Sequence, residues 1–200
     1  MKTSSIVLIS ILGFILLFGG CVGCGTINLQ RSAAQMDENV KGKWGNVQSE
    51  YQRRADLIPN LVNTVKGEAN FEQTTLTNVI QARASATQVK VDASDLSPDK
   101  IKQYQAAQGQ LSQALGRLLV VSEQYPNLQA NGAFRSLQVQ LEGTENRIKV
   151  ARNDFNSAVQ DYNSKIRTFP NNLYASWLGY TTKGYFEADA GSDKAPAVKF

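Results

Sequence analysis

The chain has 200 residues, no histidine and a formal net charge of +4 at pH 7. This length suits one domain with extensions. The lack of histidine removes the usual general base, the Ser-His and Cys-His nucleophile pairs and the commonest metal ligand. Basic and acidic residues are mixed along the chain, without the basic runs and aromatic platforms typical of nucleic-acid-binding proteins. Composition therefore argues against histidine-dependent catalysis and against a nucleic-acid partner.

The N-terminal segment, residues 1–27, is predicted to attach the chain to a membrane. No charged residue occurs from Ile6 to Ile27, and a helix needs about 20 apolar residues to cross a bilayer. The segment also contains the cysteines of the chain, Cys21 and Cys24, each preceded by small residues as in a lipoprotein acylation site. Two interpretations stay open: an uncleaved transmembrane helix, or an export signal cleaved before a lipidated cysteine.

The segment from 28 to 170 has the pattern of a helical bundle. Apolar residues recur at steps of three and four over about 36–65, 71–89, 98–125 and 134–169, which predicts four amphipathic helices. Short links make successive helices antiparallel. The first and fourth helices should be about 60 Å long and the middle two about 30–40 Å. The predicted fold is all-α: an elongated antiparallel four-helix bundle, in which the two long helices form a stalk below a four-helix head.

A proline lies inside the first predicted helix. Pro59 cannot donate an amide hydrogen bond to the carbonyl of Ala55, so it should bend this helix. Residues 51–62, YQRRADLIPNLV, resemble a signature of the LemA family of bacterial membrane-anchored proteins, and residues 141–152, LEGTENRIKVAR, resemble a second one. The resemblance covers roughly 44–186. It implies a helical fold and a membrane attachment, but no agreed molecular activity.

Polar residues in and near these two blocks are candidates for docking a partner or for setting the register between the long helices. Glu50 and Arg54 are spaced for a pair within the first helix, or they could pair across to the last helix. Asn156 and Asn163 are one heptad apart, as polar residues that fix helix pairing often are. The candidates are Arg53, Arg54, Asp56, Pro59, Asn60, Glu145, Asn146, Arg147, Arg152, Asn156 and Asn163.

The C-terminal segment, residues 171–200, is predicted to be an aromatic arm followed by a disordered tail from 188. Tyr174, Trp177 and Tyr180 suit a membrane–water interface, because the fourth helix should end level with the membrane. Packing of these aromatics against the stalk is the alternative, and the sequence leaves both open.

The preferred functional hypothesis is a non-catalytic scaffold or adaptor, held by a single N-terminal anchor in the bacterial cell membrane with its helical domain outside the cytoplasm. The expected partners are the membrane and an envelope protein or a second copy of the chain. We expect no cofactor, metal, small-molecule substrate or nucleic acid. The resemblance also suggests an accessory subunit of an envelope protease or other membrane enzyme. Further alternatives are an enzyme using carboxylates such as Glu145 and Asp154, and membrane shaping by assembled bundles.

Overall fold

A computed structural model describes residues 3–68 and 71–188, except for the side chains at 3–9, 14–25 and 28. All of the secondary structure in this described part is helical, as predicted. Its helices are α1 (Thr3–Lys66), α2 (Gln73–Gln88), α3 (Pro98–Ser122), α4 (Pro126–Ala130), α5 (Gly132–Arg167) and α6 (Asn171–Trp177). The tail predicted to be disordered lies outside the described residues from 189 onward.

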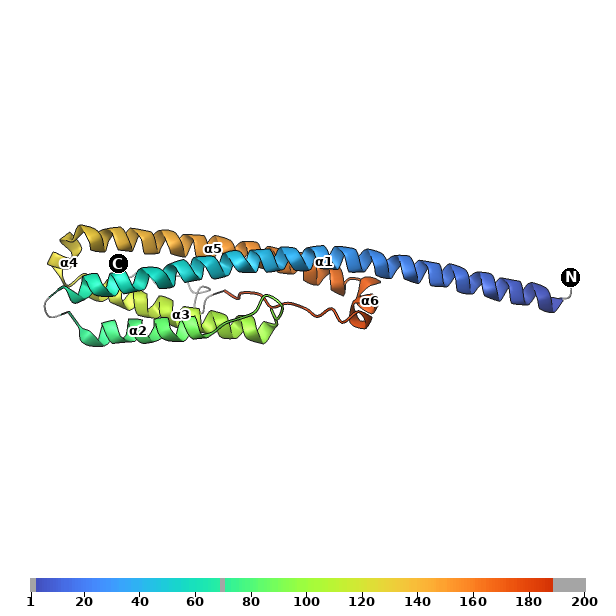
Figure 1. The fold of residues 1–200 in the computed structure, drawn as a ribbon, viewed down its shortest axis with the longest axis horizontal. Helices are drawn as coiled ribbons and strands as arrows, with labels where there is room; N and C mark the ends of the chain where they lie inside the picture. Colours follow the sequence, from blue (N-terminus) through green and yellow to red (C-terminus); the bar gives the residue numbers. More distant parts are fainter. Residues whose placement is uncertain (1–2, 69–70, 189–200) are drawn as a thin grey trace, which may run out of the picture.

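The helices form an elongated body of two antiparallel pairs (Figure 1). α1 and α5 run side by side and make the most extensive contact, and α2 and α3 form the second pair beside them. α4 lies at one end of the body, and α1 extends far beyond the other end. The predicted difference in length is confirmed, since α1 and α5 have 64 and 36 residues and α2 and α3 have 16 and 25. α1 also continues without a break from the uncharged segment into the body.

Local signals explain where two helices begin. Asn131 caps α5, because its side-chain oxygen accepts hydrogen bonds from the amides of Ala133 at 2.9 Å and Phe134 at 3.3 Å. α3 begins at Pro98, whose fixed φ suits the first helical position. The short helix α6 has no such signal, and the sequence did not predict it. It buries Ala175 against α1 and α5, so tertiary packing stabilises it.

Two buried clusters fill the body. The cluster remote from the N-terminal extension joins α1, α2, α3 and α5, with Leu128 of α4. The other is built around Trp44 of α1, whose ring lies 5.4 Å from that of Phe155 on α5 and 6.1 Å from that of Phe186. Phe186 belongs to the C-terminal arm, which we define as residues 178–188. The prediction of a stalk made mainly of two helices is therefore wrong, because α6 and this arm cover α1 and α5 there (Figure 1).

Pro59 leaves the carbonyl of Ala55 without a donor from its own helix, and a side chain of another helix supplies one. Arg83 of α2 donates its Nε–H to the carbonyl of Ala55 at 2.9 Å. Ala55 is buried, and an unsatisfied buried carbonyl would be costly. α1 accordingly continues through Pro59 to Lys66. The proline thus creates an attachment point for α2.

Arg83→Met should lower the free energy of unfolding by about 1–3 kcal/mol, because the Ala55 carbonyl would lose its donor. In a Pro59→Ala background the same substitution should cost less, since an alanine at 59 supplies the helical amide. Denaturant unfolding of the full-length protein in detergent, followed by helical circular dichroism, measures both costs. Arg117→Met, at an exposed position of α3, is the control. Equal costs of Arg83→Met in both backgrounds would contradict the coupling.

Candidate functional site

A buried guanidinium lies at the centre of the body. Arg54 of α1 is 1% exposed. Its Nη1 donates to the hydroxyl of Ser112 at 2.6 Å and to Oε2 of Glu145 at 3.0 Å. Its Nη2 donates to the backbone oxygen of Gln108 at 3.2 Å and to the side-chain oxygen of Gln108 at 2.8 Å. The ring of Tyr51 lies 5.0 Å from the guanidinium carbon. One side chain thus links α1, α3 and α5.

In this arrangement the Arg54 side chain contacts neighbouring helices, as the register alternative expects. A buried charge is tolerated when it is paired and hydrogen-bonded, and four of the five guanidinium N–H groups have acceptors. Among the described residues, Nε of Arg54 lacks a hydrogen-bond partner. A cleft of about 520 Å³ lies between α3 and the α1–α5 pair, and Arg54 and Glu145 are part of its lining. The prediction that Arg54 could belong to an exposed docking face is wrong, because the side chain lies inside the body.

A second ion pair connects the long helices closer to the surface. Arg147 of α5 donates to Oε2 of Glu50 at 3.1 Å and to the hydroxyl of Thr144 at 2.9 Å. Glu50 therefore pairs across to α5 and not with Arg54 in its own helix. Exposed pairs of this kind contribute only about 0–1 kcal/mol, so this pair adds orientation more than stability.

Several predicted candidates remain on the surface. Arg53, Asp56, Pro59 and Asn60 are exposed on α1, and Asn146 is exposed on α5. The carboxylate of Asp56 accepts a hydrogen bond from Nε2 of Gln52, in the preceding turn of the helix, at 2.7 Å. These residues are accessible to a partner, and Arg53 and Asp56 line an open depression on the surface of α1.

The two asparagines bind the C-terminal arm, and their predicted role in helix pairing is wrong. The Asn163 amide donates to the backbone oxygen of Lys183 and accepts from its N–H, both at 2.9 Å. The Asn156 amide makes the same pair of bonds to the backbone of Phe186, at 2.8 and 2.9 Å. Seven helical residues span about 10.5 Å and three extended residues about 10 Å. The heptad spacing of the asparagines therefore matches the spacing of the extended arm.

Further contacts hold the end of the arm. Gln105 of α3 donates to the backbone oxygen of Glu187 at 2.9 Å and accepts from its N–H at 3.0 Å. Arg152 donates to the same oxygen at 2.8 Å. Gly184 passes so close to α3 that a β-carbon there would lie 2.7 Å from Cα of Pro98. The arm thus lies in a groove between α3 and α5 that admits only glycine at position 184.

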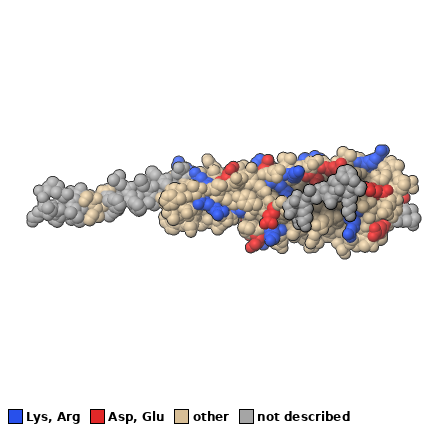
Figure 2. Space-filling view, turned by 180° about the vertical axis from the view of Figure 1, so that it is seen from behind, with Lys and Arg blue, Asp and Glu red and all other residues tan. Residues whose placement is uncertain are grey.

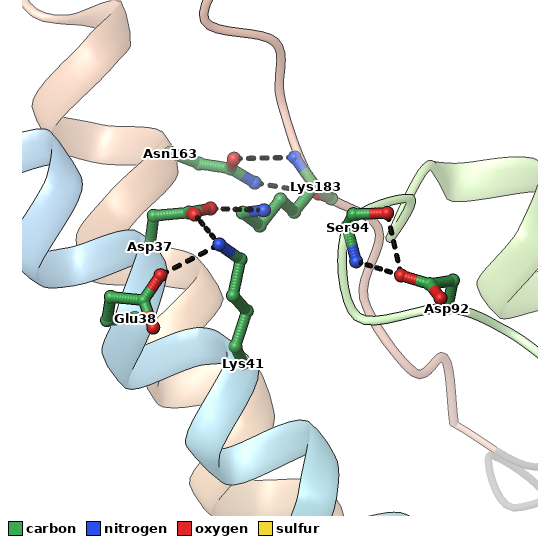
Figure 3. Close-up of polar contacts among 7 residues, drawn as sticks. All are labelled: Asp37, Glu38, Lys41, Asp92, Ser94, Asn163 and Lys183. Atoms are coloured by element: carbon green, nitrogen blue, oxygen red, sulfur yellow. Dashed lines mark hydrogen bonds and ion pairs between the residues drawn. The ribbon is translucent and has the colours of Figure 1, made fainter.

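A charged cluster fastens the beginning of the arm to α1 (Figure 3). Nζ of Lys183 lies 2.6 Å from Oδ1 of Asp37, and Lys41 lies 2.8 Å from both Asp37 and Glu38. Burial alone would raise the pKa of Asp37, but hydrogen bonds from Lys183 and Lys41 outweigh burial and hold that pKa below its usual value. The same ammonium of Lys183 lies 5.0 Å from the ring centre of Tyr162, whose pKa burial raises to about 12.

The residues predicted to meet a membrane are separated by the fold. Tyr174 and Tyr180 are half-buried against the Trp44 cluster, whereas Trp177 is exposed. Cys21 and Cys24 fall within α1, but their side chains lie outside the described residues. Over the part of the chain that the structure describes, no helix combines the length and apolarity needed to cross a bilayer.

Sequence reasoning missed several residues of these contacts. Gln108 had a visible signal, because a glutamine stands among the apolar residues of the third predicted helix. Arg83, Ser112 and Lys183 had none, since each acts on a group far away in the chain. Phe186 lies within the predicted aromatic arm, but its sequence context gave no sign that its ring is buried.

Comparison with known protein families tests the resemblance that the two sequence blocks indicated. The model of the LemA family matches residues 43–200. This chain belongs to the LemA family. The match includes the Arg54 network, the two asparagines and the arm, so the predicted resemblance is confirmed.

Curated relatives place the chain among other LemA-like proteins. It is 28% identical over 179 residues to the magnetosome proteins MamQ 1 and MamQ 2 of Paramagnetospirillum magneticum, a match that covers 79% of this chain and 64% of each relative. It is 28% identical over 142 residues to protein LemA of Metamycoplasma hominis, which covers 71% of this chain and 61% of that relative. The matches thus span under two thirds of the length of these relatives.

Proposed function

We propose that this LemA-family protein is a non-catalytic scaffold or adaptor of the bacterial cell envelope, anchored in the membrane by its N-terminal segment and carrying its helical body outside the cytoplasm. The observation that supports this proposal most is that polar side chains of the two family blocks, and the two asparagines, bind other parts of the chain. Arg54 and Glu145 join three helices, and Asn156 and Asn163 hold the arm. Amide and charged groups bound in this way position the chain rather than a substrate.

The outer face of α1 is the proposed partner contact. Gln52, Asp56 and Asn60 follow one another at intervals of four residues and are exposed, as is Arg53 beside them, so they share one side of the helix. A shallow depression of about 600 Å³ runs along this face. Its mixture of amides and both charge signs suits a protein partner with complementary charges. By helical rise, Asp56 lies about 40 Å from the end of the uncharged segment, within reach of other envelope proteins.

Complementation with a charge-swapped variant tests this proposal. In cells where loss of the protein gives a phenotype, the double substitution Arg53→Glu, Asp56→Lys should fail to restore function while leaving the helical body intact. The matched control is Glu142→Lys, Lys149→Glu, which swaps exposed charges on α5 and should complement. A photo-crosslinker at Gln52 should yield one envelope-protein adduct that the swap abolishes.

The outcomes separate the two proposed roles. Full complementation by the Arg53, Asp56 swap, without any adduct at Gln52, would exclude this face as a docking site. An adduct with an envelope protease, together with loss of that protease's activity in the swapped variant, would establish the accessory-subunit role instead.

A further inference from the structure

Exposed apolar side chains gather at the end of the body from which α1 extends. Phe169, Leu173 and Trp177 are 76%, 61% and 77% exposed, and Leu178 beside them is 37% exposed. Leu173 and Trp177 are four residues apart on α6 and share one face, and Phe169 lies in the turn just before that helix. Single exposed apolar residues need no explanation, but a patch of this kind marks an interaction site. We call these four residues the α6 patch.

The position of α6 places this patch close to the end of the uncharged N-terminal segment. Its buried residue, Ala175, belongs to the same cluster as Leu29 and Ala33 of α1, and Figure 1 shows α6 beside α1 where α1 leaves the body. The uncharged segment ends at Ile27, which by helical rise is about 3–9 Å from Leu29 and Ala33 along the axis. The polar region on each side of a bilayer core is about 5–8 Å thick. If the segment crosses the core, the α6 patch lies at headgroup depth.

The charges at this end of the body fit an anionic lipid surface. Residues 28–36 and 162–182 contain three basic residues, Arg31, Lys165 and Arg167, and no Asp or Glu. Arg31 and Arg167 are exposed, and Figure 2 shows Lys and Arg at the end of the body where the extension begins. Basic residues near the interface attract anionic headgroups, and tryptophan favours the same depth. A second protein would not require this combination of apolar patch, positive charge and adjacency to the anchor.

We propose that the α6 patch inserts into the headgroup region of the membrane that holds the N-terminal segment, as a second membrane contact. The inference rests on the membrane attachment in the proposed function. It assigns lipid contact to the four residues of the α6 patch, whereas Tyr174 and Tyr180 pack against the body. Two contacts fix the tilt and rotation of the body, whereas one helix would leave it free to turn about its axis.

The two tryptophans of the chain make a direct test available. Trp44 is fully buried and Trp177 is exposed, so in the free protein only Trp177 is open to quenchers. The full-length protein is reconstituted into vesicles of phosphatidylcholine and phosphatidylglycerol, with the phosphatidylcholine brominated near the headgroup in a parallel sample. We expect the brominated lipid to reduce emission of the wild type, and to leave a Trp177→Phe variant nearly unchanged. Trp177 should also be protected from aqueous iodide.

A paired substitution adds a second readout. Phe169→Ser with Leu173→Ser should restore iodide quenching of Trp177 and abolish quenching by brominated lipid. The matched control, Val139→Ser with Val150→Ser, changes exposed apolar residues of α5 and should leave both signals as in the wild type.

Vesicle flotation distinguishes failure of the inference from failure of the proposed function. Protein that floats with vesicles while Trp177 stays open to iodide and insensitive to brominated lipid overturns the second contact alone. Trp177 shielded from iodide but not quenched by brominated lipid, in a protein that is dimeric, overturns it in favour of a second copy. Protein that does not float overturns both the anchor and the contact.

Discussion

Phe186→Ala is expected to release the C-terminal arm and to lower the free energy of unfolding by about 3 kcal/mol. The ring of Phe186 is buried against Trp44 and Phe155, with the Arg152 guanidinium 5.1 Å from its centre. Removing it leaves a cavity at the point where α1, α5 and the arm meet. The backbone bonds from Asn156 and Gln105 would then hold an arm without its apolar anchor.

Hydrogen exchange and tryptophan emission measure this release. Amides of residues 183–187 should lose protection from exchange, and the emission of Trp44 should shift to the red in a Trp177→Phe background. Tyr185→Ala is the control, because Tyr185 is exposed beside Phe186 and should change neither signal much. Unchanged protection of the arm amides in Phe186→Ala would show that the hydrogen bonds from Asn156 and Gln105 are enough to hold the arm in place.

Glu145→Ala is expected to destabilise the protein more than Arg54→Met. Loss of Glu145, whose own side chain is 55% exposed, leaves a buried guanidinium without its carboxylate, which costs about 2–3 kcal/mol. Loss of Arg54 removes the buried charge as well, and leaves Gln108 and Ser112 short of a donor at about 1–2 kcal/mol. The ordering follows because an unpaired charge inside a protein is worse than an unpaired neutral group.

Urea unfolding of full-length variants in detergent gives these costs. The control is Arg147→Met, which breaks the more exposed pair with Glu50 and should cost no more than about 1 kcal/mol. Added salt should weaken that exposed pair more than the Arg54–Glu145 pair. An Arg54→Met variant less stable than Glu145→Ala would show instead that packing of the Arg54 stem dominates the network.

The structural consequence of these contacts is a stiff body. Arg54 bonds to α3, and Arg83 of α2 bonds to the carbonyl of the adjacent residue, Ala55, so neighbouring residues of α1 connect it to other helices. The arm closes the groove nearer the N-terminal extension. In the proposed function this stiffness keeps the docking face at a set distance from the membrane, and the α6 patch sets its orientation.

The sequence by itself determined the four main helices and the family. Periodic apolar residues, the cap at Asn131 and Pro98 at the start of α3 act within a few neighbouring residues, and so they are readable along the chain. The two sequence blocks, residues 51–62 and 141–152, identified the family for the same reason, because their order and spacing are properties of the sequence. Pro59 also predicted that the carbonyl of Ala55 lacks a helical donor, but the sequence did not show which residue would donate to it.

Only the tertiary structure decided which groups pair. The acceptors of Arg54 lie 54 to 91 residues away, and an asparagine amide serves a helix neighbour or an extended backbone equally well. The arm has no periodicity, and α6 is too short to be stable alone, so their positions depend on the surfaces that α1, α3 and α5 offer. Local propensity acts over one or two turns, whereas these contacts form only after the long helices have packed.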